Sequence, residues 1–216
     1  MIRTAPEGRW FIAGAWAIVL LLLIVAVRTG SATWWAVTGI WLALSVWVVA
    51  FFRDPERAWS IGERLVVAPA DGKVVSVVET DEPAYLGGRT VRISIFMNVF
   101  DCHVNRYPVG GTVEYRHYNP GKFGHAGAEK SSLDNEQSSV GVAAAPGKVL
   151  IRQIAGLVAR RIVTDHDVGA RVRQSQRLGM IRFGSRVDVF LPVGTRTLVR
   201  TGDTTRAGVT VVAEWS

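Results

Sequence analysis

The sequence predicts a mostly β, barrel-sandwich-like soluble domain that follows an N-terminal hairpin of two transmembrane helices. Two observations support this fold class. Apolar residues make up 49% of the 216 residues, and they are most concentrated before position 53. After that position, short runs rich in Val, Ile and Thr alternate with Gly, Pro and Asp, which is typical of many short strands joined by turns. The chain therefore divides into residues 1–52 and residues 53–216.

The first 52 residues contain two uncharged stretches, 10–27 and 33–52. Each has about the ~20 residues that a helix needs to cross a bilayer core. Because a short link of turn-forming residues joins them, and because backbone polar groups in hydrocarbon need internal partners, the two stretches are expected to form one helical hairpin. The alternative for the first stretch is a secretory signal peptide, but no small-residue cleavage site leads into a mature domain and a second stretch follows.

Positive charge flanks the outer ends of this hairpin. Arg3 and Arg9 precede the first stretch, Arg53 and Arg57 follow the second, and the link carries only Arg28. By the positive-inside rule, both outer ends face the cytoplasm. The domain of residues 53–216 is therefore expected at the cytoplasmic face of the cell (plasma) membrane.

Charge and cysteine content narrow the classes of partner. The formal net charge is +7, and the first 52 residues supply +2 of it from three arginines and one glutamate. The remaining +5 suits a domain that works beside anionic lipid, although a merely solvated basic surface is an equal alternative. Nucleic acid is not expected as a partner, because no basic tract is interleaved with aromatic residues. The single cysteine, Cys102, excludes an internal disulfide, and with no recognised spacing of metal ligands around it no metal site is expected.

The strands of the second part can be placed from its apolar runs. Segments 122–137 and 154–161 interrupt them and are expected to be an irregular loop and a short helix. Turn glycines before strands resemble the hairpins of biotinyl and lipoyl carriers, a likeness of fold only. A non-enzymatic, membrane-tethered lipoyl-like binding module is thus one alternative function, although Lys73 lacks the neighbouring Met that such a module would carry. The predicted strands are 65–67, 72–78, 90–96, 111–115, 147–154, 186–191, 197–199 and 209–215.

The dipeptide Gly184-Ser185 stands directly before an alternating strand. In isolation such a dipeptide is most often a turn. Here glycine, which has no Cβ, lets the serine hydroxyl approach the preceding carbonyl. Attack of Ser185 on the Gly184 carbonyl would give an ester, and β-elimination would break the chain between residues 184 and 185. The resulting dehydroalanine would hydrolyse to a pyruvoyl group and ammonia.

Residues 183–192, Phe-Gly-Ser-Arg-Val-Asp-Val-Phe-Leu-Pro, resemble the processing site of phosphatidylserine decarboxylases, particularly the short prokaryotic form. Five further segments resemble the same family in the same order, and together they cover essentially the whole soluble part. The chain is therefore identified as a member of this family of pyruvoyl-dependent proenzymes. The five segments are Pro69-Ala-Asp-Gly72, Asp101-Cys-His-Val-Asn-Arg-Tyr-Pro108, Pro120-Gly-Lys-Phe123, Asn135-Glu136 and Ile154-Ala-Gly-Leu-Val-Ala-Arg-Arg-Ile162.

The resemblance implies a triad-like set of Asp71, His103 and Ser185. In such a set the histidine takes the hydroxyl proton, and the carboxylate orients the imidazole. From the residues alone, Asp71 before a glycine is typical of a turn, and His103 is compatible with an ordinary buried histidine. Many longer members carry a second histidine where this chain has Arg106. It is therefore open whether His103 serves both self-cleavage and decarboxylation.

The resemblance also implies the reaction: decarboxylation of phosphatidylserine to phosphatidylethanolamine and CO2 in phospholipid biosynthesis. The pyruvoyl group from Ser185 would form a Schiff base with the serine headgroup and accept the electrons that CO2 leaves behind. Arg182 or Arg186 would bind the lipid phosphate, the alternative being surface ion pairs. The mature protein would be a heterodimer of a large chain, 1–184, and a small chain, 185–216, and a homo-oligomer of it is compatible with the sequence. The alternative substrate is archaetidylserine or another serine-headed lipid.

Overall fold

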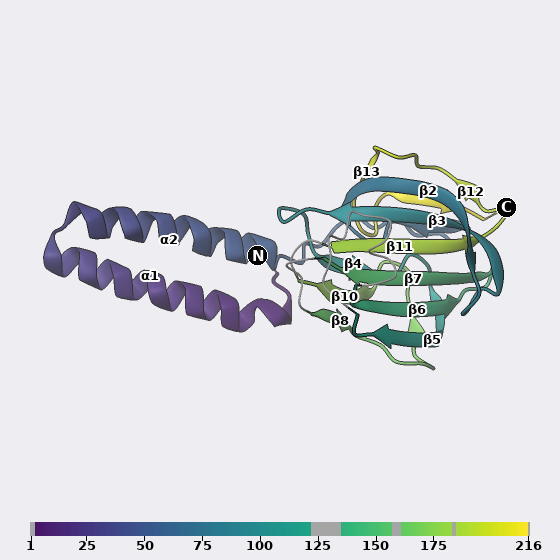
Figure 1. Cartoon of the computed structure of the whole chain (residues 1–216), viewed down its shortest axis with the longest axis horizontal. Helices are drawn as coiled ribbons and strands as arrows, with labels where there is room; N and C mark the ends of the chain where they lie inside the picture. The colour runs from purple at the N-terminus through teal and green to yellow at the C-terminus, as the bar shows by residue number, and fades with distance from the viewer. Residues whose placement is uncertain (1–2, 122–134, 157–160, 183–184, 216) are drawn as a thin grey trace. The chain divides into compact units, whose positions relative to one another are not determined.

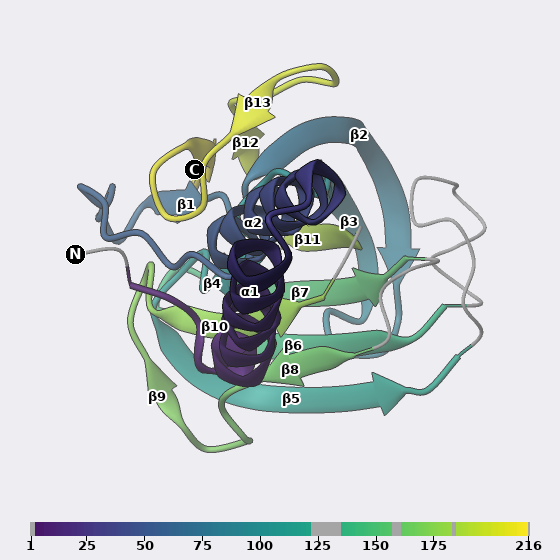
Figure 2. The ribbon, with the colours of Figure 1, turned by 90° about the vertical axis from the view of Figure 1, so that its left-hand side faces the viewer.

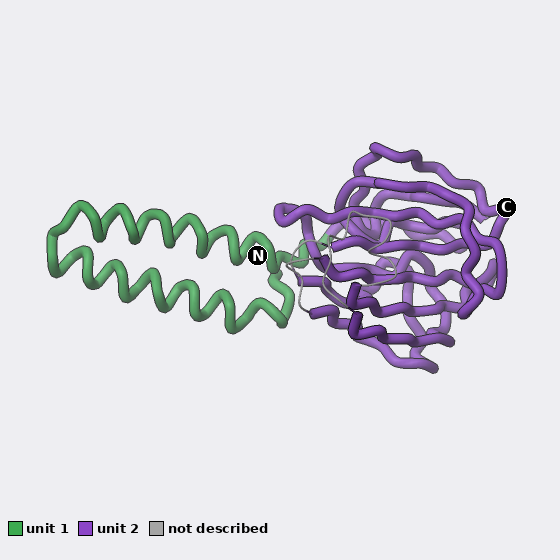
Figure 3. Tube along the Cα trace, viewed as in Figure 1, with its two compact units in different colours: residues 1–56 green, residues 57–216 purple. Residues whose placement is uncertain are grey.

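The computed structural model describes residues 3–121, 135–156, 161–182 and 185–215 (Figure 1). The chain folds as two compact units, residues 1–56 and residues 57–216 (Figure 3). The first unit is helical and the second is built from strands. The predicted fold class, a mostly β domain preceded by a helical hairpin, is confirmed.

The first unit consists of a short 3-10 turn, η1 (Pro6–Gly8), and two helices, α1 (Arg9–Thr29) and α2 (Ala32–Phe51). Helix α1 ends at Thr29 and is capped by Gly30, whose left-handed backbone lets its N–H reach the carbonyl of Ala26 at 3.0 Å. The two helices are joined across their interface, because the Trp41 indole and the Ser45 hydroxyl both donate to the Ala15 carbonyl, at 3.2 and 3.4 Å. Such polar contacts hold helices together where the surroundings are apolar. Both helices are long and apolar enough to cross a membrane.

Within its described residues, the second unit contains three antiparallel sheets, the largest of which curls around a core (Figure 2). Its eight strands run in the order β13-β2-β3-β11-β7-β6-β5-β9, and two three-stranded sheets have the orders β1-β14-β12 and β4-β10-β8. The strands are β1 (Leu65–Val67), β2 (Gly72–Glu82), β3 (Gly88–Met97), β4 (Val104–Arg106), β5 (Gly111–Asn119), β6 (Gln137–Ala143), β7 (Lys148–Ala155), β8 (Ile162–Thr164), β9 (Arg171–Val172), β10 (Arg177–Ile181), β11 (Ser185–Pro192), β12 (Arg196–Thr197), β13 (Thr204–Thr205) and β14 (Val211–Glu214).

Strand β11 lies inside the large sheet, between β3 and β7. All eight of its residues pair with β3, and the first six also pair with β7. Because side chains alternate along a strand, Val187, Val189 and Leu191 enter the hydrophobic core. Arg186 and Asp188 point to the other face of the sheet and are buried there too. Both faces of β11 are therefore covered, which is unusual for a charged strand.

The strand predictions agree with the structure in most of the long runs, but they miss the seven-residue strand β6 and several short strands. Strands β4, β6, β8, β9, β10 and β13 were not predicted. The helix expected at 154–161 is wrong at its first two residues, since β7 continues through Ala155. There Ala155 pairs with Ser185 and its N–H bonds to the Glu136 carbonyl at 3.0 Å, so pairing on both sides decides the conformation. Gly156 and Arg161, the other described residues of the expected helix, are not helical either. Residues 122–134 and 157–160, which hold most of the expected loop and the remaining four residues of the expected helix, lie outside the described residues.

Candidate active site

Ser185 begins strand β11 and has no exposed surface. It lies opposite Met97, the last residue of β3, on one side and Ala155, the last residue of β7, on the other. Its hydroxyl donates to the Met97 sulfur at 3.4 Å. Gly184, the other half of the expected cleavage site, lies outside the described residues. The structure thus places the predicted nucleophile at one end of the sheet, with its side chain on the core face.

His103 directly precedes β4 and is also completely buried. Its Nδ1 lies 3.0 Å from the Asp101 carbonyl oxygen. Since a carbonyl only accepts, Nδ1 must carry the proton, and Nε2 holds the lone pair whenever the ring is neutral. The His103 carbonyl accepts the N–H of Ile181 at 3.4 Å, four residues before Ser185. The backbone therefore sets both the tautomer of this ring and its place beside the segment that leads to Ser185.

Asp71 directly precedes β2 and is held from two sides. Both terminal nitrogens of Arg57 bond to its carboxylate, at 2.6 and 2.7 Å, and the Ala207 N–H donates to it at 2.8 Å. The next residue, Gly72, has φ 148°, and a Cβ there would lie 2.1 Å from the Phe96 carbonyl oxygen. Glycine is required at this close approach of β2 to the end of β3.

The three predicted residues come from segments near one end of the large sheet. Ser185 and the residue after Asp71 both border the last two residues of β3, while His103 is bonded to the strand that leads into β11. In the part of the chain that the structure describes, the hydrogen bonds of the Asp71 carboxylate go to Arg57 and Ala207, and the Nδ1 proton of His103 goes to the Asp101 carbonyl. A direct pair between Asp71 and His103 stays a prediction.

Two of the arginines considered in the sequence analysis, Arg106 and Arg186, have defined side-chain partners. The Arg106 guanidinium lies 4.3 Å from the centre of the Trp59 ring and donates to the Ser175 carbonyl at 3.1 Å. Arg186 is only 2% exposed and makes a two-pronged ion pair with Asp188, at 2.6 and 2.7 Å. Arg186 is therefore not an exposed arginine of the protein surface.

Two further charged side chains, partly buried Arg152 and buried Glu82, extend this ion pair into a cluster. Arg152 lies directly across from Asp188 on β7, and its guanidinium lies 4.8 Å from the centre of the Phe190 ring. It also lies 3.5 Å from the carboxylate of Glu82. Burial lowers the pKa of Arg152, and the charges of Asp188 and Glu82 counteract that effect. The cluster links β11 to β7 and to the end of β2 on the face away from the core.

Three buried residues near Ser185 were missed by the sequence analysis: Met97, Asn105 and Gln153. None has exposed surface, and the Gln153 amide donates to the Asn105 side-chain oxygen at 2.8 Å. A signal for one of them existed in the sequence. Gln153 is in phase with the core residues Val149 and Ile151, so a polar side chain stands where the alternation demands an apolar one.

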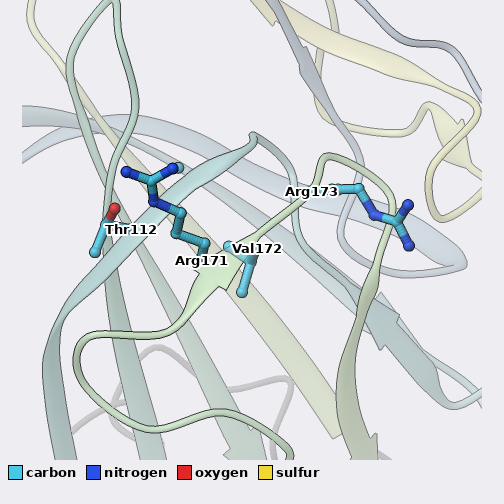
Figure 4. Close-up of a pocket in the computed structure, with 5 residues that line it drawn as sticks. Thr112, Arg171, Val172 and Arg173 are labelled. Carbon is cyan, nitrogen blue, oxygen red and sulfur yellow. The ribbon is translucent and has the colours of Figure 1, made fainter.

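A hollow of about 410 Å³ lies at the opposite end of the sheet (Figure 4). It is lined by residues that include Thr112, Arg171 and Arg173. Thr112 pairs with the last residue of β6, which in turn pairs with the first residue of β7, whereas Ser185 pairs with the last residue of β7. The Arg171 and Arg173 side chains point away from each other (Figure 4). The hollow is thus separate from the residues around Ser185.

Comparison with known proteins shows the family to which the chain belongs. Residues 44–213 match the family model for phosphatidylserine decarboxylase. Curated proteins named phosphatidylserine decarboxylase proenzyme are 45% identical in Ruegeria pomeroyi, covering 97% of this chain and 94% of the relative, and 45% identical in Symbiobacterium thermophilum, covering 96% and 94%. The relative of that name from Nitrobacter winogradskyi is 47% identical over 97% of this chain and 83% of its own length. These matches decide against the non-enzymatic binding module. The chain belongs to the phosphatidylserine decarboxylase family and is a decarboxylase.

Proposed function

We propose that this chain cuts itself between Gly184 and Ser185 and then decarboxylates phosphatidylserine to phosphatidylethanolamine and CO2. The observation that carries the proposal is the position of Ser185. It is a buried serine at the very start of a strand that is paired on both sides. A cut before this residue leaves its new amino end held in the sheet by every residue that follows in β11.

The cut needs only groups of the chain itself. The Ser185 oxygen forms a bond to the Gly184 carbonyl carbon while the peptide C–N bond breaks, and the hydroxyl proton passes by way of a base to the nitrogen. We assign the base to Nε2 of His103, since the Asp101 carbonyl directs the Nδ1 proton away from it. Loss of the Ser185 Cα proton then breaks the ester C–O bond. This leaves a Gly184 carboxylate and a dehydroalanine, which water converts to a pyruvoyl end and ammonia.

The space around Ser185 fits such a group. A pyruvoyl group has one heavy atom fewer than the serine residue it replaces, because a ketone oxygen takes the place of the nitrogen and the hydroxyl oxygen is lost. It therefore needs no more room between Met97 and Ala155 than Ser185 does. When present, a pyruvoyl group supplies a carbonyl that accepts the electron pair left by departing CO2. The residues of this chain orient the site and exclude water: Met97, Ala155 and His103 are all fully buried. Asp71, held by Arg57 in an ion pair, places a carboxylate at the same end of the sheet.

The large and small chains, 1–184 and 185–216, are proposed to stay together as a heterodimer. The small chain supplies β11 and β13 to the large sheet and β12 and β14 to a three-stranded sheet. Strand β14 also pairs with β1 of the large chain. Removing the small chain would expose the core on two sheets, so packing and backbone pairing hold the two pieces together after the covalent link is gone.

The two apolar helices are proposed to anchor the enzyme in the plasma membrane, with residues 57–216 on the cytoplasmic side. The arginines outside the two helices support this orientation. A tethered enzyme meets the headgroup of its lipid substrate at the bilayer surface. The basic charge of this part of the chain favours an anionic lipid there.

The deciding experiment is intact-mass analysis of the purified protein beside Ser185→Ala. We expect the wild type to yield a small chain that begins with a blocked pyruvoyl end, and the variant to stay whole. Mature protein is then given vesicles of phosphatidylserine or of archaetidylserine, and CO2 release is measured for each. If the wild type remains a single chain, the proposed self-cleavage is refuted. Faster turnover of archaetidylserine than of phosphatidylserine would refute only the assignment of the lipid substrate.

A further inference from the structure

A line of buried polar side chains ends at the Ser185 hydroxyl. The Met97 sulfur that accepts this hydroxyl at 3.4 Å also accepts the Asn105 side-chain N–H at 3.6 Å. Behind Asn105, the Gln153 amide donates to the Asn105 oxygen at 2.8 Å, and the Thr164 hydroxyl donates to the Gln153 oxygen at 3.0 Å. We call Met97, Asn105, Gln153 and Thr164 the relay. Its members come from four different strands, β3, β4, β7 and β8.

The relay lies where the fold would otherwise use apolar side chains. Met97, Asn105 and Gln153 have no exposed surface, and the neighbours of Gln153 on the same face of β7 belong to the hydrophobic core. A buried amide is costly unless it is hydrogen-bonded, and two buried polar partners can be replaced together by apolar groups with little loss. Stability of the core therefore does not account for this pair of amides.

The thioether determines the direction of every bond in the relay. A methionine sulfur only accepts, so Asn105 must turn its N–H group toward it and its oxygen toward Gln153. Gln153 must then present its own N–H group to Asn105 and its oxygen to Thr164, which has to donate. The Thr164 oxygen is left to accept from Ser138, 2.9 Å away. The side chains cannot flip singly without bringing two acceptors or two donors face to face.

We propose that the relay positions the Ser185 hydroxyl for self-cleavage, and that Met97 is the residue through which it acts. This inference rests on the proposed self-cleavage and adds a determinant of its rate. A thioether is a weak acceptor. It aligns the hydroxyl but leaves the proton loosely held, ready for transfer to a base. The amides behind it keep the sulfur in one place, and the sulfur in turn fixes the direction in which the serine hydroxyl points.

The test follows cleavage of newly made full-length chains. Wild type and Met97→Leu are synthesised without cells in the presence of phospholipid nanodiscs, and the small chain is quantified over time by mass spectrometry. Leucine conserves the volume of methionine and removes the acceptor. We expect cleavage to slow about ten- to a hundredfold, the scale on which misplaced reacting groups act. Ile95→Val, a conservative change at another buried position of β3, is the control and should cleave at the wild-type rate.

A second variant separates positioning from packing. Asn105→Leu/Gln153→Leu removes both amides, so neither leaves the other unpaired. It should slow cleavage while changing the melting temperature little. Added to Met97→Leu, it should produce no further slowing, because both changes act through the same sulfur.

Two outcomes would refute the positioning role of the relay. One is cleavage of Met97→Leu at the wild-type rate. The other is a triple variant whose fold-reduction in cleavage rate equals the product of the reductions caused by Met97→Leu and by the amide variant. If the amide variant does not fold, Met97→Leu against its control decides alone. A wild type that is never cut would instead refute the self-cleavage on which the relay depends.

Discussion

Arg57 holds Asp71 with both of its terminal nitrogens, at 2.6 and 2.7 Å, and both side chains are largely buried. The two residues are separated by only a short stretch of chain, and the ion pair ties the start of the β domain to the entry of strand β2. A carboxylate this well neutralised can support the fold, take part in the chemistry, or do both. The two roles predict different behaviour in variants.

Asp71→Asn and Arg57→Ala are expected to lower the free energy of unfolding by about 1–3 kcal/mol each, because each leaves a partly buried polar group without its partner. If Asp71 also acts in self-cleavage, Asp71→Asn will slow the cut far more than Arg57→Ala does. Denaturant unfolding and the time course of cleavage measure the two effects. Arg3→Ala, which breaks the exposed pair with Glu56, should change neither. If both variants are cleaved at the wild-type rate, Asp71 only stabilises the fold and takes no part in self-cleavage.

His103→Ala is expected to abolish self-cleavage, since it removes the base whose tautomer the Asp101 carbonyl sets. His117→Ala is the matched control: this histidine is exposed on β5, and the variant should mature as the wild type does. Gel analysis of the purified proteins distinguishes whole from cut chains. A cut His103→Ala protein would remove the histidine from this role.

Asp188→Asn is expected to destabilise the protein by about 3–5 kcal/mol, because it leaves the buried Arg186 guanidinium without its counter-charge. The double variant Arg186→Met/Asp188→Leu removes both charges and should cost much less. Unfolding in urea of uncut Ser185→Ala protein gives the comparison without the complication of chain separation. If the double variant proved as unstable as the single one, the pair would matter for its wider contacts, such as that of Asp188 with Arg152.

Stability at alkaline pH is expected to depend on Tyr107. Burial of its ring, reinforced by Asp165, raises the pKa of Tyr107. The folded chain therefore keeps a phenol proton that the unfolded chain loses above its ordinary pKa of about 10. The unfolded state then binds fewer protons, and stability falls as pH rises above that value. Tyr107→Phe should reduce this loss, as judged by melting temperatures at pH 9 and pH 11. Parallel decline in both proteins would contradict the assignment.

Long-range pairing explains which features could be predicted from the sequence. The two apolar helices and most of the long strands were predictable because composition and alternation are local properties. Strand β10 was missed because Leu178-Gly-Met has no alternation, and Gly179 there adopts φ 154° beneath the Val163 carbonyl. Ser185, His103 and Asp71 were proposed as site residues from their motifs. Three contacts could not be predicted from any local pattern, because they depend on segments that only the fold brings together. They are the ion pair of Arg57 with Asp71, the contact of the Asp101 carbonyl with His103, and the relay behind Ser185.

The double pairing of strand β11 bears on the timing of maturation. Both neighbours, β3 and β7, must already be in register before Ser185 is buried between Met97 and Ala155. Under the proposed cut, an unfolded or misassembled chain carries only an inert serine, and a reactive ketone arises solely where the sheet has closed. Self-cleavage would therefore occur only in correctly folded chains. Because the cut is irreversible, every active enzyme molecule would have reached the folded state at least once.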